Sequence, residues 1–254
     1  MRASYVDGQI QGRPAQSVLE QSISQKYPIG AIYDDLIGRR WRYCKAVAAI
    51  AVASRGCPAM QPASWTAGAM SMGSDATSVT GSQGDSRVLV TTGGDYDETH
   101  AKDYFFGGTL TIFPSAGDVI YRHAITGNDA SFGSDVYFYA YIDPPLAADC
   151  SAVPCDVMSS PYAYVGAPGS VGTGYSVICV PSVLVTQYYY FWGQTRGPCF
   201  ITPNAEWTTA STREAEFHTD GTIKAGAGVA LQRAGFIIYC NSADADANVM
   251  LMLE

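Results

Sequence analysis

Apolar and polar residues alternate along this chain over short segments, which is typical of β-strands that bury one face. The segments recur at roughly ten-residue spacing, separated by Gly, Asp, Asn and Ser. No segment has the pattern of an amphipathic helix longer than about ten residues. The sequence therefore predicts an all-β protein, a β-sandwich or β-barrel in one domain or two in tandem. The strands clearest in the pattern are 87–92, 104–113, 118–125, 134–142, 162–165, 175–180, 183–192, 199–202, 236–240 and 248–253.

The chain divides into three parts by pattern. Residues 1–26 are polar and aperiodic, and we expect an extended N-terminal arm that becomes ordered on a partner surface. Residues 27–180 are the predicted β-rich domain, which includes a long surface loop from 143 to 161. Residues 181–254 are a C-terminal β domain or the second half of the same fold. The segment VAAIAVAS at 47–54 suits a short helix, a buried strand or a loop.

Two aromatic segments could either be buried in a core or interface or be exposed as a ligand-binding surface. In the strand at 134–142, Phe138 faces one side, whereas Tyr137, Tyr139 and Tyr141 face the other. In the run from Tyr188 to Trp192, consecutive rings likewise face opposite sides. We predict that one face of this run lies in the core and that a neighbouring subunit or a second sheet covers the other. Trp192 is the predicted core residue and Phe191 the predicted interface residue. Exposed rings at 188–192 or 137–141 would instead suit a carbohydrate.

Composition narrows the partners. Charged residues make up 15% of the 254 residues, against roughly 25% in ordinary soluble domains. Such a surface suits a protein partly covered by neighbours, or simply one rich in Tyr, Ser and Thr. The net charge of −8 argues against nucleic-acid binding by phosphate neutralisation. Apolar runs are too short to span a bilayer, and residues 1–16 lack the apolar core of a secretory signal. We expect neither nucleic acid nor membrane as a partner.

Candidate chemistry is sparse. His100, His123 and His218 lie far apart, in none of the spacings used by metal or catalytic sites. No nucleophile elbow or phosphate-binding loop is present. The seven dispersed cysteines favour free buried thiols in a reducing cytosol, with a Cys150–Cys155 disulfide as the alternative. We therefore expect no enzymatic activity, with no catalytic residues, bound metal or cofactor.

A basic cluster is the one strong concentration of charge. Four of the 15 basic residues fall within seven positions, from Arg39 to Lys45. They suit electrostatic contact with an acidic partner surface, or simply a turn and the polar face of one strand. Together with the aromatic run they provide the candidate interface residues, which are Arg39, Arg40, Arg42, Lys45, Tyr188, Tyr190 and Trp192.

Three segments resemble structural proteins of tailed double-stranded-DNA phages. The first is YPIGAIYDDLIGRRWRYCKAVAAIAVA, matched at Gly30, Asp34, Gly38, Trp41, Arg42, Tyr43, Lys45 and Ala46. The second is YYYFWGQTRGPCFITPNA, matched at Tyr190, Trp192, Gln194, Thr195, Gly197 and Pro198. The third, VALQRAGFIIYCNSADADANVMLML, is similar to the end of capsid decoration proteins. Residues 56–180 show no resemblance beyond their β character.

The resemblance implies a non-enzymatic virion structural protein, foremost a capsid decoration or cement protein that stabilises the assembled shell. Its implied partners are the major capsid protein, other virion subunits and further copies of this chain, as a dimer or trimer. It would be made in the host cytoplasm and lie on the capsid surface of the virion. A tail, fibre or self-assembling tube subunit is one alternative. A virion-borne module that binds carbohydrate or host is another.

Overall fold

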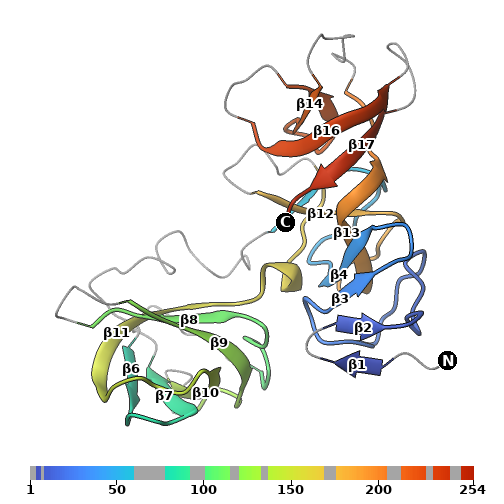
Figure 1. Cartoon of the computed structure of the whole chain (residues 1–254). Helices are drawn as coiled ribbons and strands as arrows, with labels where there is room; N and C mark the ends of the chain where they lie inside the picture. Colours follow the sequence, from blue (N-terminus) through green and yellow to red (C-terminus); the bar gives the residue numbers. More distant parts are fainter. Residues whose placement is uncertain are drawn as a thin grey trace. The chain divides into compact units, whose positions relative to one another are not determined.

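The computed structural model contains two compact units, Met1–Met60 with Pro161–Glu254, and Gln61–Ser160 (Figure 1). It describes residues 4–6, 9–59, 78–91, 101–114, 120–132, 137–168, 176–204, 213–226, 231–240 and 247–254. Strands account for nearly all regular elements described, next to one 3-10 turn, η1 (Pro161–Ala163). The predicted all-β class is therefore confirmed. The turn η1 lies where a strand was expected at 162–165.

The unit Gln61–Ser160 is a closed antiparallel barrel with strand order β10-β7-β6-β11-β8-β9. Alternate side chains fill its interior, as the 0% exposure of Val88, Val90, Phe138 and Ala140 shows. The predicted facing of the strand around Phe138 is confirmed, because Tyr137 on the other side is 36% exposed. The strands are β6 (Ser78–Gly81), β7 (Arg87–Thr91), β8 (Thr109–Ile112), β9 (Tyr121–Asn128), β10 (Tyr137–Asp143) and β11 (Cys150–Met158).

Strand β11 corrects the prediction of a surface loop from 143 to 161. It pairs with β6 on one side and β8 on the other, and so closes the barrel. Its register shifts between Cys150 and Val153, where Ala152 has a positive φ of 51°. A bulge of this kind inserts a residue and interrupts the period of two. The strand is therefore hidden in the local pattern.

The other unit is built on one large sheet with the path β1-β2-β3-β4-β13-β17-β16-β14-β15. Strand β12 pairs with β13 and with β5 beside this path. The pair β2 and β3 is parallel, whereas β13 is antiparallel to both of its neighbours, β4 and β17. The strands are β1 (Ser4–Val6), β2 (Gln9–Gln11), β3 (Ile32–Asp34), β4 (Arg40–Lys45), β5 (Cys57–Pro58), β12 (Val177–Pro181), β13 (Tyr190–Phe200), β14 (Glu214–Phe217), β15 (Ile223–Ala225), β16 (Arg233–Cys240) and β17 (Ala247–Met252).

The division of the chain differs from the predicted boundaries at 26/27 and 180/181. The range 27–180 contributes to both units, and residues 181–254 complete the sheet that residues 9–59 begin. Strand β13 starts at Tyr190, several residues later than expected, and continues to Phe200. It thereby takes in part of the segment expected as a separate strand at 199–202. The segment 47–54 is a loop, tied to the sheet by a bridge between Ile50 and Val185.

Strand β13 separates two cores. Trp192 lies in one with Trp41 and Tyr43, and Phe191 lies in the other with Cys44. Both Trp192 and Phe191 are 0% exposed. The prediction of a core position for Trp192 is confirmed. The prediction that Phe191 contacts another subunit is wrong, because residues of its own chain already cover it.

The thiols of Cys179 and Cys44 lie beside Gly193 of β13. Cys179 is also directly opposite Cys57 across β12 and β5. Burial raises the pKa of Cys44 and of Cys57. Every cysteine whose side chain is described is free and buried, as predicted. Cys150 and Cys155 are among these and form no disulfide, whereas the side chain of Cys240 lies outside the described part.

We predict that Gly193→Ala lowers the free energy of unfolding by about 1–3 kcal/mol, the usual cost of overpacking a core. An added Cβ would lie 2.6 Å from both Cβ and Sγ of Cys179. Urea denaturation followed by tryptophan fluorescence measures the loss. Gly226→Ala is the control, since the nearest atoms to its Cβ, at 3.1 Å, belong to the flexible Glu214 side chain. An equal loss in both variants would contradict close packing at Gly193.

Candidate functional site

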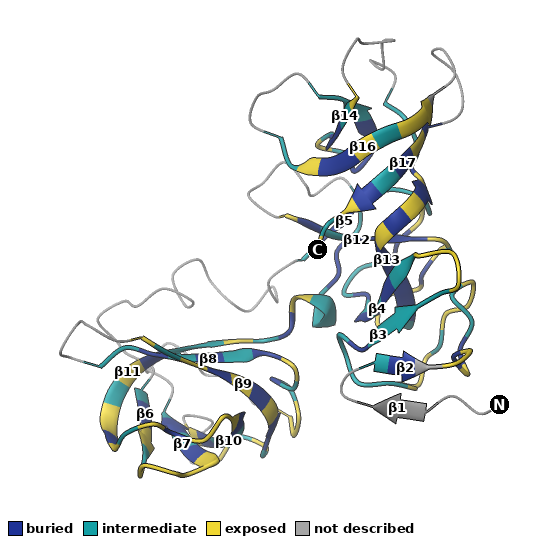
Figure 2. Cartoon of the chain, viewed as in Figure 1, coloured by how far each residue is buried: buried dark blue, intermediate teal, exposed yellow. Residues whose placement is uncertain are grey.

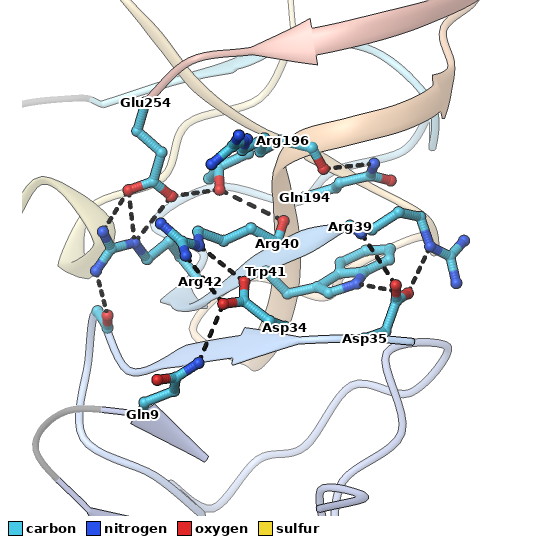
Figure 3. Close-up of polar contacts among 12 residues, drawn as sticks. Gln9, Asp34, Asp35, Arg39, Arg40, Trp41, Arg42, Gln194, Arg196 and Glu254 are labelled. Atoms are coloured by element: carbon cyan, nitrogen blue, oxygen red, sulfur yellow. Dashed lines mark hydrogen bonds and ion pairs between the residues drawn. The ribbon is translucent and has the colours of Figure 1, made fainter. Parts of the chain in front are cut away.

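The predicted basic cluster lies on and beside β4, where carboxylates of the same chain meet it (Figure 3). Arg39 Nε donates to Asp35 Oδ2 at 2.6 Å. Arg40 donates from Nε and Nη2 to the two oxygens of Asp34 at 2.8 and 2.9 Å. Gln9 Nε2 donates to the same carboxylate at 3.0 Å. The hydrogen bond from Arg40 holds the pKa of Asp34 below its usual value.

Arg42 is tied to the last residue described, Glu254. Its Nε lies 3.1 Å from each carboxylate oxygen, and its Nη1 donates to the carbonyl of Gly30 at 3.0 Å. Thr195 Oγ1 also donates to the Glu254 carboxylate. Burial alone would raise the pKa of Glu254, but the hydrogen bonds from Arg42 and Thr195 keep it below its usual value. Internal partners therefore neutralise the three arginines of the cluster, which leaves little of their charge for an acidic partner surface.

The remaining predicted interface residues differ widely in exposure. Tyr188 is 60% exposed, whereas Trp192 is 0% exposed and contributes no surface. Tyr190 is half-buried, with its ring stacked on Tyr43 at 5.9 Å between centroids. Lys45 Nζ lies 5.7 Å from the centroid of the Tyr190 ring. The structure thus brings Lys45 and Tyr190 together, and it corrects the assignment of Trp192 to an interface.

The expected N-terminal arm is fastened to its own chain over the part that is described. Gln16 is 4% exposed, and its Oε1 accepts a hydrogen bond of 2.7 Å from the Tyr43 hydroxyl. Its Nε2 donates to the Tyr190 carbonyl at 3.1 Å. Its own carbonyl accepts from Trp192 Nε1 at 3.1 Å. Through Gln16 the segment therefore contacts its own chain, whereas the sequence analysis expected its contacts to be with a partner surface.

An apolar surface that the sequence analysis did not identify lies on β13, β17 and β16. Met250 is directly opposite Pro198 on one side and Phe236 on the other. Phe236 is 41% exposed, and Phe200 and Met252 of the same face are 42% and 52% exposed. Every second position is buried along β17 and over the last five residues of β13 (Figure 2). We call Pro198, Phe200, Phe236, Met250 and Met252 the outer face.

The sequence does contain a pattern from which the outer face could have been predicted. The segments VMLML and FIIY are apolar at successive positions, so both faces of β17 and β16 carry apolar side chains. One of those faces fills the core, through residues such as Val249 and Leu251. The second apolar face is then left uncovered by the described part of the chain. Uncovered apolar patches of this kind mark contact sites for other macromolecules.

A metal site would need several His, Cys, Asp or Glu side chains close together. Among the described residues, no three His, Cys, Asp or Glu side chains are placed to hold a metal ion. His123 Nδ1 lies 2.6 Å from the carbonyl of Pro144, and His218 Nδ1 lies 3.1 Å from Asp220 Oδ1. His100 falls outside the described ranges. In the part of the chain that the structure describes, no helix is long and apolar enough to span a membrane.

We predict that Glu254→Gln lowers the free energy of unfolding at pH 7 by about 1–2 kcal/mol, because it removes a charged hydrogen-bond acceptor. The folded-state pKa of Glu254 lies below the usual 4.5. Its stabilising effect is therefore complete above that pH and is lost as the pH falls through the folded-state value. Chemical denaturation between pH 7 and pH 3 should show wild type and variant converging in acid.

The matched control for this pH series is Glu214→Gln. Glu214 pairs with Arg233 through side chains that are 44% and 63% exposed. Exposed pairs contribute about 0–1 kcal/mol, so this change should matter little at any pH. A constant difference between wild type and Glu254→Gln across the whole pH range would contradict the assigned role of the carboxylate.

Comparisons with known proteins identify no relative of this chain. No protein-family model matches the chain, and no curated protein or solved structure matches it. The resemblance of the three segments to phage proteins therefore stays an expectation. The function has to be argued from the resemblance and the described contacts.

Proposed function

We propose that this chain is a non-enzymatic virion structural protein, foremost a capsid decoration or cement protein bound to an assembled phage shell. The observation that carries the proposal is where the three phage-like segments lie. They supply β3 and β4, then β13, then β16 and β17, and these strands are consecutive in the sheet order β3-β4-β13-β17-β16. Segments far apart in sequence thus form one continuous structural element, which is what a shared fold would require.

The outer face is the surface we assign to shell contact. It sits on β13, β16 and β17, which are themselves phage-like segments, and it is apolar at adjacent positions on three paired strands. The arginines of the basic cluster are occupied by Asp34, Asp35 and Glu254. Contact would therefore rest mainly on apolar area, beside the exposed Arg196 opposite Met252 and Asn248 opposite Phe200.

Binding of this kind would stabilise a capsid by mass action. A protein that binds the assembled shell and not its free subunits shifts the equilibrium toward assembly. Its partners would be the major capsid protein and further copies of this chain. A dimer or trimer would suit the symmetry axes of a shell, and several weak contacts would add up through multivalency.

The direct test uses virus particles banded by density from the source material of this sequence. Peptides of this chain should band with those of the major capsid protein at a constant ratio, and antibody-gold should label the shell. Label confined to the tail would overturn the decoration role in favour of a tail, fibre or tube subunit. Absence of the chain from the particles would overturn any virion role.

We predict that Phe236→Lys weakens particle binding and self-association by about 2 kcal/mol, roughly thirtyfold, because it places a charge within the apolar contact. The melting temperature should stay close to that of wild type, since the side chain is already 41% exposed. Native mass spectrometry measures self-association, and co-sedimentation measures particle binding. Met158→Lys on β11 of the barrel, 46% exposed, is the control. Wild-type behaviour of both variants would contradict contact through the outer face.

A further inference from the structure

Several aromatic rings lie on the outside of the barrel and are not part of its core. Phe132 lies opposite Tyr137 in a short antiparallel bridge, with reciprocal backbone hydrogen bonds of 2.8 and 3.2 Å. The Phe132 ring stacks on Tyr137 at 5.8 Å and on Tyr139 at 5.6 Å between centroids, with interplanar angles of 29° and 21°. Phe132 is 44% and Tyr137 36% exposed. We call Phe132, Tyr137 and Tyr139 the aromatic strip.

A fixed polar group borders the aromatic strip. Asp129 Oδ2 accepts from Arg87 Nη2 at 3.1 Å, and its Oδ1 accepts from the Tyr141 hydroxyl at 3.0 Å. The Arg87 guanidinium carbon lies 3.5 Å from the centroid of the Tyr139 ring. Arg87 is directly opposite Tyr141 across β7 and β10, so both project from the same face. Stacked rings and a carboxylate–guanidinium pair are thus held side by side on one rigid surface.

We propose that the aromatic strip, with Asp129 and Arg87, binds a carbohydrate. The C–H-rich face of a pyranose ring stacks on an exposed aromatic ring, while its hydroxyls need both acceptors and donors at the edge. A carboxylate offers about four acceptor sites and a guanidinium five donors, so the bond between Asp129 and Arg87 leaves capacity for hydroxyls. Their side chains are also accessible, at 36% and 50% exposed.

The size of the aromatic strip favours a small ligand over a protein. Phe132 and Tyr137 at 44% and 36% exposure offer about 160 Å², taking a ring residue as roughly 200 Å². A stable protein interface needs about 800 Å² from each partner. The net charge of −8 opposes a nucleic acid, whose bases would also stack on such rings. A sugar is compatible with both the small contact area and the negative net charge, because it is small and needs no dense positive charge on the protein.

This inference does not depend on the proposed virion role. The aromatic strip belongs to the barrel, and the outer face to strands of the large sheet, so different substitutions disable each. If both hold, the chain would carry a glycan-binding site on a particle. If the particle experiment fails, the glycan experiment remains decisive for the aromatic strip.

The test is retention of the full chain on immobilised glucan, xylan, galactan, chitin oligosaccharides and uronic-acid polysaccharides. Wild type should bind at least one of them, and Phe132→Ala should bind it at least tenfold more weakly. Met158→Ala removes an apolar side chain of similar exposure, 46%, from β11 of the same barrel and should bind like wild type. Asp129→Asn should also weaken binding, since it removes the charge that orients Arg87.

Two further measurements keep the result clear. Phe132→Tyr retains a stacking ring and should restore binding, which separates a lost contact from a damaged hairpin. Near-ultraviolet circular dichroism should show the same folded barrel in every variant compared. Failure of wild type to bind any of these glycans would overturn the proposal, as would undiminished binding by a folded Phe132→Ala.

Discussion

Burial of the first part of β13 on both faces, from Phe191 to Thr195, is the constraint on which the large sheet depends. Trp192 faces one core and Phe191 the other, so neither side of this part of the strand can turn toward solvent. Gly193 lets the thiol of Cys179 approach the strand on the Phe191 side. On the Trp192 side, Gln16 binds both the indole and the Tyr43 hydroxyl, which draws the N-terminal segment into the fold. One strand thereby joins residues from both ends of the chain.

In the large sheet the arginines around β4 pair with carboxylates of the same chain, whereas the outer face carries apolar side chains. The arginines around β4 are neutralised by Asp34, Asp35 and Glu254, which pin the hairpin of β3 and β4 and the chain after β17. Meanwhile the outer face around Met250 stays uncovered by the described chain. Ion pairs made within one chain specify its own geometry. The partner contact that we propose for this sheet would therefore rest on shape and apolar area.

The barrel is the unit to which we assign the proposed glycan site. Closure of six strands leaves no free edge and gives β7 and β10 a rigid outer surface. Beside these strands the bridge between Phe132 and Tyr137 and the Asp129–Arg87 contact are already formed, which would reduce the entropy lost if a ligand bound there. A phage-type structural sheet and a sugar-binding barrel would together form a particle protein that both attaches to its shell and touches carbohydrate.

Local alternation in the sequence determined the all-β class, the inward position of Phe138 and the burial of Trp192, because side-chain facing follows from a residue's immediate neighbours. The barrel strand β11 escaped this reasoning, since its bulge at Ala152 breaks the period of two. Four features were decided by the tertiary structure alone: the division into units, the attachment of Gln16, the pairing of Arg42 with Glu254, and the exposure of Phe236. Each depends on which distant strands lie side by side, and pairing between residues up to 212 positions apart leaves no trace in a local pattern.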